Sequence, residues 1–152
     1  ALTCARTLPG VDSSRVAAVG FCFGGMTALE LARSGADVAG VISVHGLLGA
    51  GEVANATIRA SVLCLHGHDD PMGPPADVLA FETEMTAANA DWQLHVFGRT
   101  KHAFTNPAAN DHGLGTVYNQ LANDRAQRAI ADFLAELFAS PQGVTEEEWQ
   151  AD

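Results

Sequence analysis

A cysteine between two glycines is the first feature of this sequence that could do covalent chemistry. Residues 20–25 read Gly-Phe-Cys-Phe-Gly-Gly and follow a short apolar run. In this pattern a strained turn between a strand and a helix presents the nucleophile, and the flanking glycines let strand and helix approach closely. The helix amino terminus favours a thiolate, and the N–H of Phe23 would point at an oxyanion. The motif predicts that Cys22 is a nucleophile; the alternative is an inert buried cysteine.

An acid and a histidine follow in the order that a catalytic triad needs. Asp70 lies in His-Gly-His-Asp-Asp-Pro, and His102 lies in Lys-His-Ala-Phe further along the chain. Asp70 would hold the imidazole in one tautomer and stabilise its charged form, while His102 would take the thiol proton and return it to the leaving group. Alone, a loop histidine is usually solvated and an Asp before Pro usually caps a turn. The order of nucleophile, acid and histidine is that of α/β-hydrolases.

The acid loop also allows a second interpretation, as a metal site. Its pattern H-x-H-x-D is reminiscent of metallo-β-lactamase-type hydrolases, which usually continue with a further histidine where this chain has Pro71. The possible ligands are His66, His68 and Asp70, with His102 and His112 as distant ones. Because a zinc site needs three or four convergent ligands, we expect no catalytic metal and no cofactor. His66 and His68 are then expected to pack around the acid loop.

Alternating apolar runs and helical patterns predict the elements that position these residues. Apolar runs predict strands at residues 15–21, 38–44 and 61–65, and the alternation of apolar and polar residues predicts a fourth at residues 92–97. Helical patterns predict helices at residues 26–33, about 75–89 and about 116–138. Strands separated by helices imply an α/β fold, with a parallel sheet covered by helices on both faces. Ligands bind such sheets at the carboxyl ends of the strands, just before the positions of Cys22, Asp70 and His102.

The composition bounds the class of protein. The 152 residues, 47% of them hydrophobic, suit a single domain, which we place at residues 1–139 with an acidic tail at 140–152. A net charge of -10 disfavours nucleic acid and anionic membranes as partners. No apolar run approaches a membrane span and no signal-peptide pattern begins the chain, so we expect a cytoplasmic protein. Three widely spaced cysteines do not suggest a disulfide framework.

Three motifs together resemble the dienelactone hydrolase family. They are Gly-Phe-Cys-Phe-Gly-Gly, His-Gly-x-x-Asp-Pro and Lys-His-Ala-Phe-Thr-Asn-Pro, and the resemblance spans residues 12 to about 137. It implies an α/β-hydrolase fold and hydrolysis of a small ester or lactone through a thioester. The residues implied are the triad Cys22, Asp70 and His102, with Asp69 as the fallback acid, Phe23 in the oxyanion hole, and Phe104 and Asn106 in contact with substrate.

The sequence departs from this family in two ways. Family members are longer at the amino end, where further strands supply a second oxyanion-hole N–H and a glutamate that helps to govern activation of the cysteine. This sequence starts at Ala1 without those strands, so we expect the carboxyl-terminal portion of the fold. In dienelactone-cleaving members a basic residue stands four positions after the catalytic histidine, whereas Asn106 stands there in this chain, which disfavours dienelactone as the substrate.

Two readings of the function remain open from the sequence. The first is the ester or lactone hydrolase described above. The second is a non-catalytic fragment or interaction module that retains the fold. Without the amino-terminal strands one edge of the sheet is exposed, and a second copy of the chain could cover it, so a homo-oligomer is possible.

Overall fold

The computed structural model of this protein describes residues 2–51 and 57–139. The described helices are α1 (Leu2–Arg6), α2 (Phe23–Arg33), α3 (Pro75–Ala87) and α4 (Gln120–Phe138). The described strands are β1 (Ala17–Phe21), β2 (Gly40–Val44), β3 (Ser61–Gly67), β4 (Trp92–Phe97), β5 (Asn110–Asp111) and β6 (Thr116–Val117). The predicted acidic tail, residues 140–152, lies outside the described residues.

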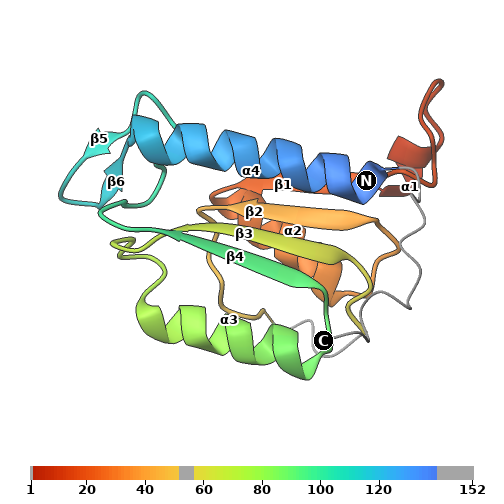
Figure 1. Ribbon diagram of the computed structural model, residues 1–152, viewed down its shortest axis with the longest axis horizontal. Coiled ribbons are helices and arrows are strands. Elements are labelled where there is room, and N and C mark those ends of the chain that lie inside the picture. Colours follow the sequence, from red (N-terminus) through yellow and green to blue (C-terminus); the bar gives the residue numbers. More distant parts are fainter. Residues whose placement is uncertain (1, 52–56, 140–152) are drawn as a thin grey trace, which may run out of the picture.

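Four of the strands form one parallel sheet in the order β1-β2-β3-β4 (Figure 1). Helix α2 connects β1 to β2, and α3 connects β3 to β4, as expected where parallel strands need a crossover. Because the strands are parallel, their carboxyl ends lie at the same end of the sheet. The sequence-based prediction of a parallel sheet is confirmed.

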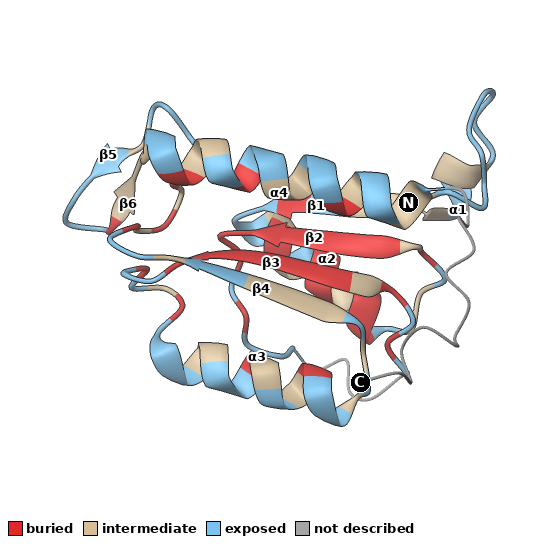
Figure 2. Cartoon of the chain, viewed as in Figure 1, coloured by how far each residue is buried: buried red, intermediate tan, exposed pale blue. Residues whose placement is uncertain are grey.

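Helices cover both faces of this sheet. Ala28, Leu29 and Ala32 of α2 and Phe81 and Met85 of α3 pack against one face, together with Val41, Val62 and Cys64 of the strands. Ala122, Ala126 and Phe133 of α4 pack against the other face, together with Ile42, Val44, Leu63 and Leu65. Successive residues of β2 and β3 thus point to opposite faces, and both strands are buried almost throughout (Figure 2). The prediction that helices cover both faces is confirmed.

Two helices begin at positions that differ from the prediction. Helix α2 starts at Phe23, not at Met26, and so includes both glycines of the cysteine motif. Helix α4 starts at Gln120 because the side chain of Asn119 accepts a hydrogen bond from the N–H of Ala122, at 3.1 Å. The residues just before it, Thr116–Val117, form β6, which pairs with β5 in a small antiparallel ribbon that the sequence did not predict.

Strand β1 is one of the two edge strands of the sheet within the described residues, and β4 is the other. Its Val19 and Phe21 are 43% and 46% exposed. An apolar groove of about 660 Å³ runs beside it, and Leu2 of α1 and Leu31 of α2 are among the residues that line it. The first strand is therefore much less covered than β2 or β3.

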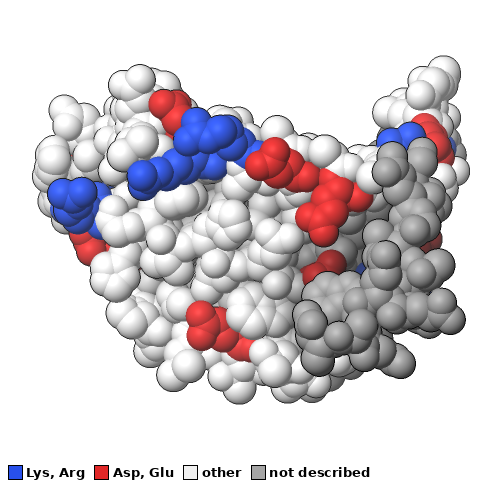
Figure 3. Space-filling view, viewed as in Figure 1, with Lys and Arg blue, Asp and Glu red and all other residues white. Residues whose placement is uncertain are grey.

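The charged side chains are distributed unevenly along α4. Figure 3 shows Lys and Arg side chains over its first half and Asp and Glu side chains over its second half.

Among the described residues, no helix has the length and apolar character that crossing a bilayer requires.

Candidate active site

Cys22 lies in a sharp turn between the end of β1 and the start of α2. Its backbone has φ 54° and ψ -120°, a conformation that few residues other than glycine adopt. The carbonyl of Cys22 accepts hydrogen bonds from the N–H groups of Gly25 and Met26, at 3.0 and 3.2 Å. A Cβ on Gly20 would overlap the carbonyl of Gly24, which explains why the motif has a glycine there. The turn leaves the thiol of Cys22 exposed at the carboxyl edge of the sheet.

Asp70 follows β3 and is held by hydrogen bonds on both carboxylate oxygens. Oδ1 accepts from the N–H of Met72 at 2.8 Å, and Oδ2 accepts from Nδ1 of His102, also at 2.8 Å. Burial raises the pKa of the Asp70 carboxyl, but the hydrogen bonds from His102 and Met72 outweigh burial and leave the pKa below its ordinary value. Asp70 therefore stays ionised. Its neighbour Asp69 is exposed, so Asp70 is the acid that contacts the histidine.

His102 connects the acid to the cysteine. It follows β4 in a turn in which Ala103 has a positive φ of 55°. Nδ1 faces Asp70, and Nε2 lies 3.1 Å from Sγ of Cys22. The hydrogen bond to Asp70 raises the pKa of His102 to about 9, against the opposing effect of burial and with a further contribution from Cys22. At neutral pH the imidazole is thus protonated, and an imidazolium beside a thiol stabilises the thiolate.

A second histidine, His45, lies beside the row formed by Cys22, His102 and Asp70. It was not among the site residues predicted from the sequence. It follows β2, and its ring is 5.2 Å from the ring of His102 between centroids. Its Nδ1 lies 3.2 Å from the backbone nitrogen of Cys22, and its Nε2 lies 2.8 Å from Oγ1 of Thr105. The signal in the sequence that could have indicated His45 is its position directly after a strand in the middle of the sheet. The residues that follow parallel strands lie at the same end of the sheet.

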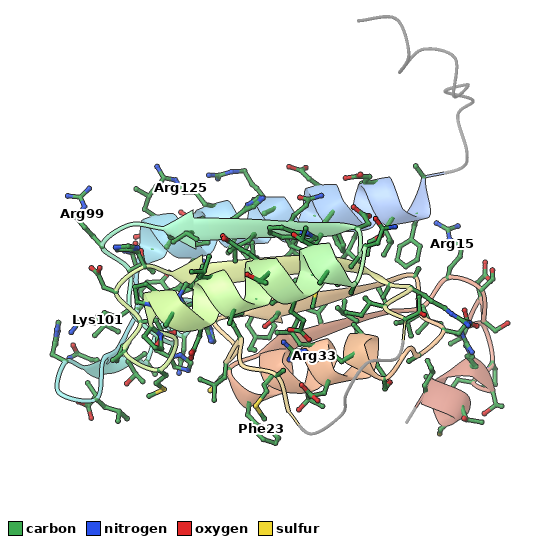
Figure 4. The ribbon with its side chains drawn as sticks, turned by 90° about the horizontal axis from the view of Figure 1, so that it is seen from below. Arg15, Phe23, Arg33, Arg99, Lys101 and Arg125 are labelled. Carbon is green, nitrogen blue, oxygen red and sulfur yellow. The ribbon has the colours of Figure 1, made fainter. Side chains whose placement is uncertain are left out.

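Of the other residues predicted for the site, Phe23 lies at the start of α2, Phe104 lies in the core and Asn106 lies at the surface. The N–H of Phe23 is at the start of α2 and has no hydrogen-bond partner among the described residues, so it is free to bind an oxyanion. Figure 4 shows the side chain of Phe23 at the surface, where it is 72% exposed. Phe104 is fully buried and packs against the rings of His45 and Phe97. Asn106 is exposed, and its Oδ1 accepts from the N–H of Ala108 at 3.0 Å.

The residues of the alternative metal interpretation do not converge within the described part of the chain. His66 is buried under the acid loop, whereas His68 and His112 are exposed. No group of three or more His, Cys, Asp or Glu side chains among the described residues could hold a metal ion. Nδ1 of His66 has no hydrogen-bond partner there, and burial lowers the pKa of this imidazole.

The row Cys22, His102 and Asp70 has the geometry of an activated nucleophile. Nε2 of His102 contacts Sγ of Cys22, Asp70 contacts Nδ1 of His102, and the N–H of the residue after Cys22 has no hydrogen-bond partner among the described residues. Such an arrangement can form a covalent bond to an electrophilic carbonyl and then release it to water.

Comparisons with known proteins place the chain in a family. The model of the dienelactone hydrolase family matches residues 1–138. The uncharacterized protein K02A2.1 of Caenorhabditis elegans is 35% identical over 143 residues, which cover 91% of this chain and 90% of that protein.

Two solved structures are similar at higher identity. The dienelactone hydrolase-like promiscuous phosphotriesterase P91, from metagenomic libraries, is 40% identical with a TM-score of 0.81, over 90% of this chain and 58% of P91. The protein m3DLH is 40% identical with a TM-score of 0.80, over 88% of this chain and 56% of m3DLH. The chain thus spans somewhat more than half the length of these two structures.

Proposed function

The chain belongs to the dienelactone hydrolase family, with an α/β-hydrolase fold, and on that premise we propose that it hydrolyses small carboxylic esters or lactones through a thioester on Cys22. The observation that carries this proposal is the unbroken row from Sγ of Cys22 to Nε2 of His102 at 3.1 Å and from Nδ1 of His102 to Asp70 at 2.8 Å. A buried, inert cysteine would not face a histidine that is itself held by a carboxylate.

The first half of the proposed reaction forms the thioester. The thiolate of Cys22 attacks the ester carbonyl, and the carbonyl electron pair moves to oxygen, where the N–H of Phe23 stabilises the negative charge. When the tetrahedral intermediate collapses, the carbon–oxygen bond to the alcohol breaks. The alkoxide takes the proton from Nε2 of the His102 imidazolium and leaves as the alcohol. In a lactone this alcohol remains attached to the acyl group.

The second half regenerates the enzyme. Neutral His102 removes a proton from water, and the hydroxide attacks the thioester carbonyl. Collapse of the second tetrahedral intermediate breaks the carbon–sulfur bond, so the carboxylic acid leaves and the thiolate returns beside the imidazolium. Throughout the cycle Asp70 orients His102 and balances its charge.

Labelling of the chain's cysteines tests the nucleophile directly. Cys4 and Cys22 are exposed, whereas Cys64 is buried, and burial raises the pKa of the Cys64 thiol far above its ordinary value. Limited iodoacetamide treatment at mildly acidic pH, read by peptide mass spectrometry, should mark Cys22 before Cys4. Equal rates at these two exposed cysteines would remove the support for the triad.

Acylation tests the reaction itself. With p-nitrophenyl acetate we expect a burst of nitrophenol and an acetyl group on the peptide that contains Cys22. The variant Cys22→Ala should abolish both, while the matched variant Cys4→Ala should leave them unchanged. A burst that persists in Cys22→Ala would assign the reaction to another residue.

A second candidate substrate class is the phosphotriester. The observation that favours it is the 40% identity to P91, whose name describes a promiscuous phosphotriesterase. The same thiolate would attack phosphorus and expel the aryloxide, leaving a phosphorylated cysteine that water must hydrolyse. Paraoxon would then release nitrophenol in a reaction that Cys22→Ala abolishes; a release that survives this substitution would rule out the candidate.

A further inference from the structure

His45 is the one histidine besides His102 whose ring faces the nucleophile within the described residues. It lies at the carboxyl end of β2 and is 3% exposed. Its ring packs edge to face on His102, with 5.2 Å between centroids, and on Phe104, with 5.1 Å. The neighbours that surround it therefore belong to the proposed catalytic row and to the core below that row.

Two hydrogen bonds determine where the proton of His45 lies. The backbone N–H of Cys22 can only donate, and it lies 3.2 Å from Nδ1, so Nδ1 must accept and carries no proton. The same N–H also reaches the carbonyl of Val44 at 3.0 Å, as the sheet pairing requires. The proton of the neutral ring is then on Nε2 and is donated to Oγ1 of Thr105 at 2.8 Å.

We propose that His45, held as the Nε2–H tautomer by Thr105, is a positioning residue that keeps Cys22 and His102 in their reactive arrangement. It connects three loops that are far apart in sequence: the turn at Cys22, the end of β2, and the loop after His102. This inference rests on the proposed function, because it names what orients the nucleophile and the base of that reaction.

The electrostatics of the site support a neutral His45. Burial, with the charge of His102, lowers the pKa of His45 to about 4, although a backbone hydrogen bond and the charge of Asp70 partly oppose this shift. The titratable groups that face the ring are Cys22, His102 and Asp70, so His102 is the imidazole of the pair that carries charge at neutral pH. Protonation of His45 would remove one of the two acceptors of the Cys22 N–H, leaving the carbonyl of Val44, and would place a second cation beside His102.

Backbone strain gives independent support. Five described residues other than glycine have a positive φ, and three of them, Cys22 (54°), His45 (41°) and Ala103 (55°), lie in or next to the site, whereas Asn89 and Arg99 lie elsewhere. Such conformations are unfavourable and persist where the surroundings hold them in place. The bonds from His45 to Cys22 and Thr105 join the three strained turns and supply that restraint.

Substitutions at His45 separate its hydrogen bonds from its volume. His45→Phe keeps an aromatic ring but loses both bonds, whereas His45→Asn keeps an acceptor close to the place of Nδ1 and tolerates the positive φ. With the 152-residue chain, we expect His45→Phe to slow alkylation of Cys22 by iodoacetamide at neutral pH by about 5-fold, the effect of one ordinary hydrogen bond. His45→Asn should recover most of that loss.

Thr105 tests the tautomer separately. Thr105→Val removes the acceptor for Nε2–H at nearly constant volume and should slow alkylation by about 2- to 5-fold, while Thr105→Ser should match the wild type. Nitrogen NMR shifts of His45 in the wild type should show a protonated Nε2 and an unprotonated Nδ1. This measurement and Thr105→Val decide the proposal even if His45→Phe does not fold.

The outcomes distinguish this inference from the proposed function. If Cys22 of the wild type reacts no faster than Cys4, the proposed function fails. If Cys22 is activated but His45→Phe and Thr105→Val alkylate at the wild-type rate and change only the melting temperature, His45 is a packing residue and the inference is overturned. A protonated Nδ1 on His45 would overturn it as well.

Discussion

The two imidazoles of the site differ in charge at neutral pH, because His102 is protonated and His45 is neutral. This difference gives the stability of the fold a defined pH dependence. The pKa of His102 is raised from 6.5 to about 9, so its contribution is fully present below about pH 6.5 and is lost as the pH rises through about 9. The pKa of His45 is lowered from 6.5 to about 4, so its contribution is present above about pH 6.5 and is lost as the pH falls through about 4. Thermal stability should therefore be highest between these two limits, which melting curves across the pH range can test.

The carboxylate of Asp70 is what keeps His102 charged. In Asp70→Asn the pKa of His102 should fall, so the imidazolium beside Cys22 is lost at neutral pH and acylation should slow by about 100- to 10,000-fold. The matched control is Asp69→Asn, one residue away and exposed, which should behave as the wild type. A larger loss in Asp69→Asn than in Asp70→Asn would reassign the acid.

The motifs predicted that Cys22, Asp70 and His102 act together, whereas the contacts of His45 with them are visible only in the structure. Cys22, Asp70 and His102 could be found because each lies in a short motif directly after an apolar run. His45 also follows such a run, in Ser-Val-His-Gly, yet a single histidine after a strand does not show which partners it meets. Its contacts with Cys22 and Thr105 arise because neighbouring parallel strands end at one edge.

At the scale of elements, the turn from β1 to α2 depends on one glycine more than on the other. A Cβ on Gly20 would collide with the backbone of α2, lying 2.6 Å from the nitrogen of Gly25, whereas a Cβ on Gly24 would meet nothing within 4 Å. Gly20→Ala should therefore cost about 3 kcal/mol of unfolding free energy. Gly24→Ala, in the first turn of α2, should stabilise by up to about 1 kcal/mol. Urea unfolding of both variants checks the contrast, and equal losses would contradict it.

Arg33 connects α2 to α3 through a buried ionic contact. Its guanidinium is 2% exposed and binds both carboxylate oxygens of Glu84, at 2.8 and 2.6 Å, and one of Glu30, at 2.8 Å. Figure 4 shows Arg33 between the two helices. Arg33→Met leaves these acids without their cation and should lower the free energy of unfolding by roughly 3 kcal/mol. Arg125→Met, on the exposed face of α4, should change it by less than about 0.5 kcal/mol.

Element types were more predictable from the sequence than their ends. Strand β4 occupies the predicted residues 92–97, because Trp92, Leu94 and Val96 alternate with polar residues along this stretch. Helix α2 begins earlier than predicted because Gly24 and Gly25 are typical of a loop, whereas both lie in the first turn of the helix, where a Cβ on Gly25 would crowd Ser43 and Gly46. The ribbon of β5 and β6 has two residues in each strand, too few for any periodicity to indicate it.

At the scale of the whole molecule, the candidate active site lies next to the free edge of β1. Strand β1 leads directly into Cys22, and the groove beside β1 includes Gly20 and Gly24 on either side of that residue. A chain segment that covers the edge of β1 would therefore come close to the nucleophile. The chain spans 58% of P91 and 56% of m3DLH, so both structures have further residues that could occupy this position.

The number of oxyanion donors then determines how fast this chain reacts alone. In the proposed reaction the described site supplies one donor, the N–H of Phe23, and the resemblance described above implies a second donor from strands at the amino end. Losing one donor costs about 100- to 1000-fold in rate. We therefore expect a weak burst with p-nitrophenyl acetate that depends on Cys22, and slow turnover compared with a chain extended upstream. Rapid hydrolysis of unactivated esters by the 152-residue chain would contradict this.

If the chain hydrolyses esters rapidly, the dependence of its specific activity on protein concentration would show whether a second oxyanion donor comes from the same chain or from a second copy. A specific activity that rises with concentration would mean that a second copy, seated on the free edge of β1, completes the site. A specific activity that stays constant on dilution would place the donor within the chain itself. We expect the slow rate and a constant specific activity, because β1 of a single chain has no strand beyond it among the described residues. Substituting the exposed Val19 by Lys, which should block pairing at this edge, separates the two cases: it lowers the rate only if a second copy contributes.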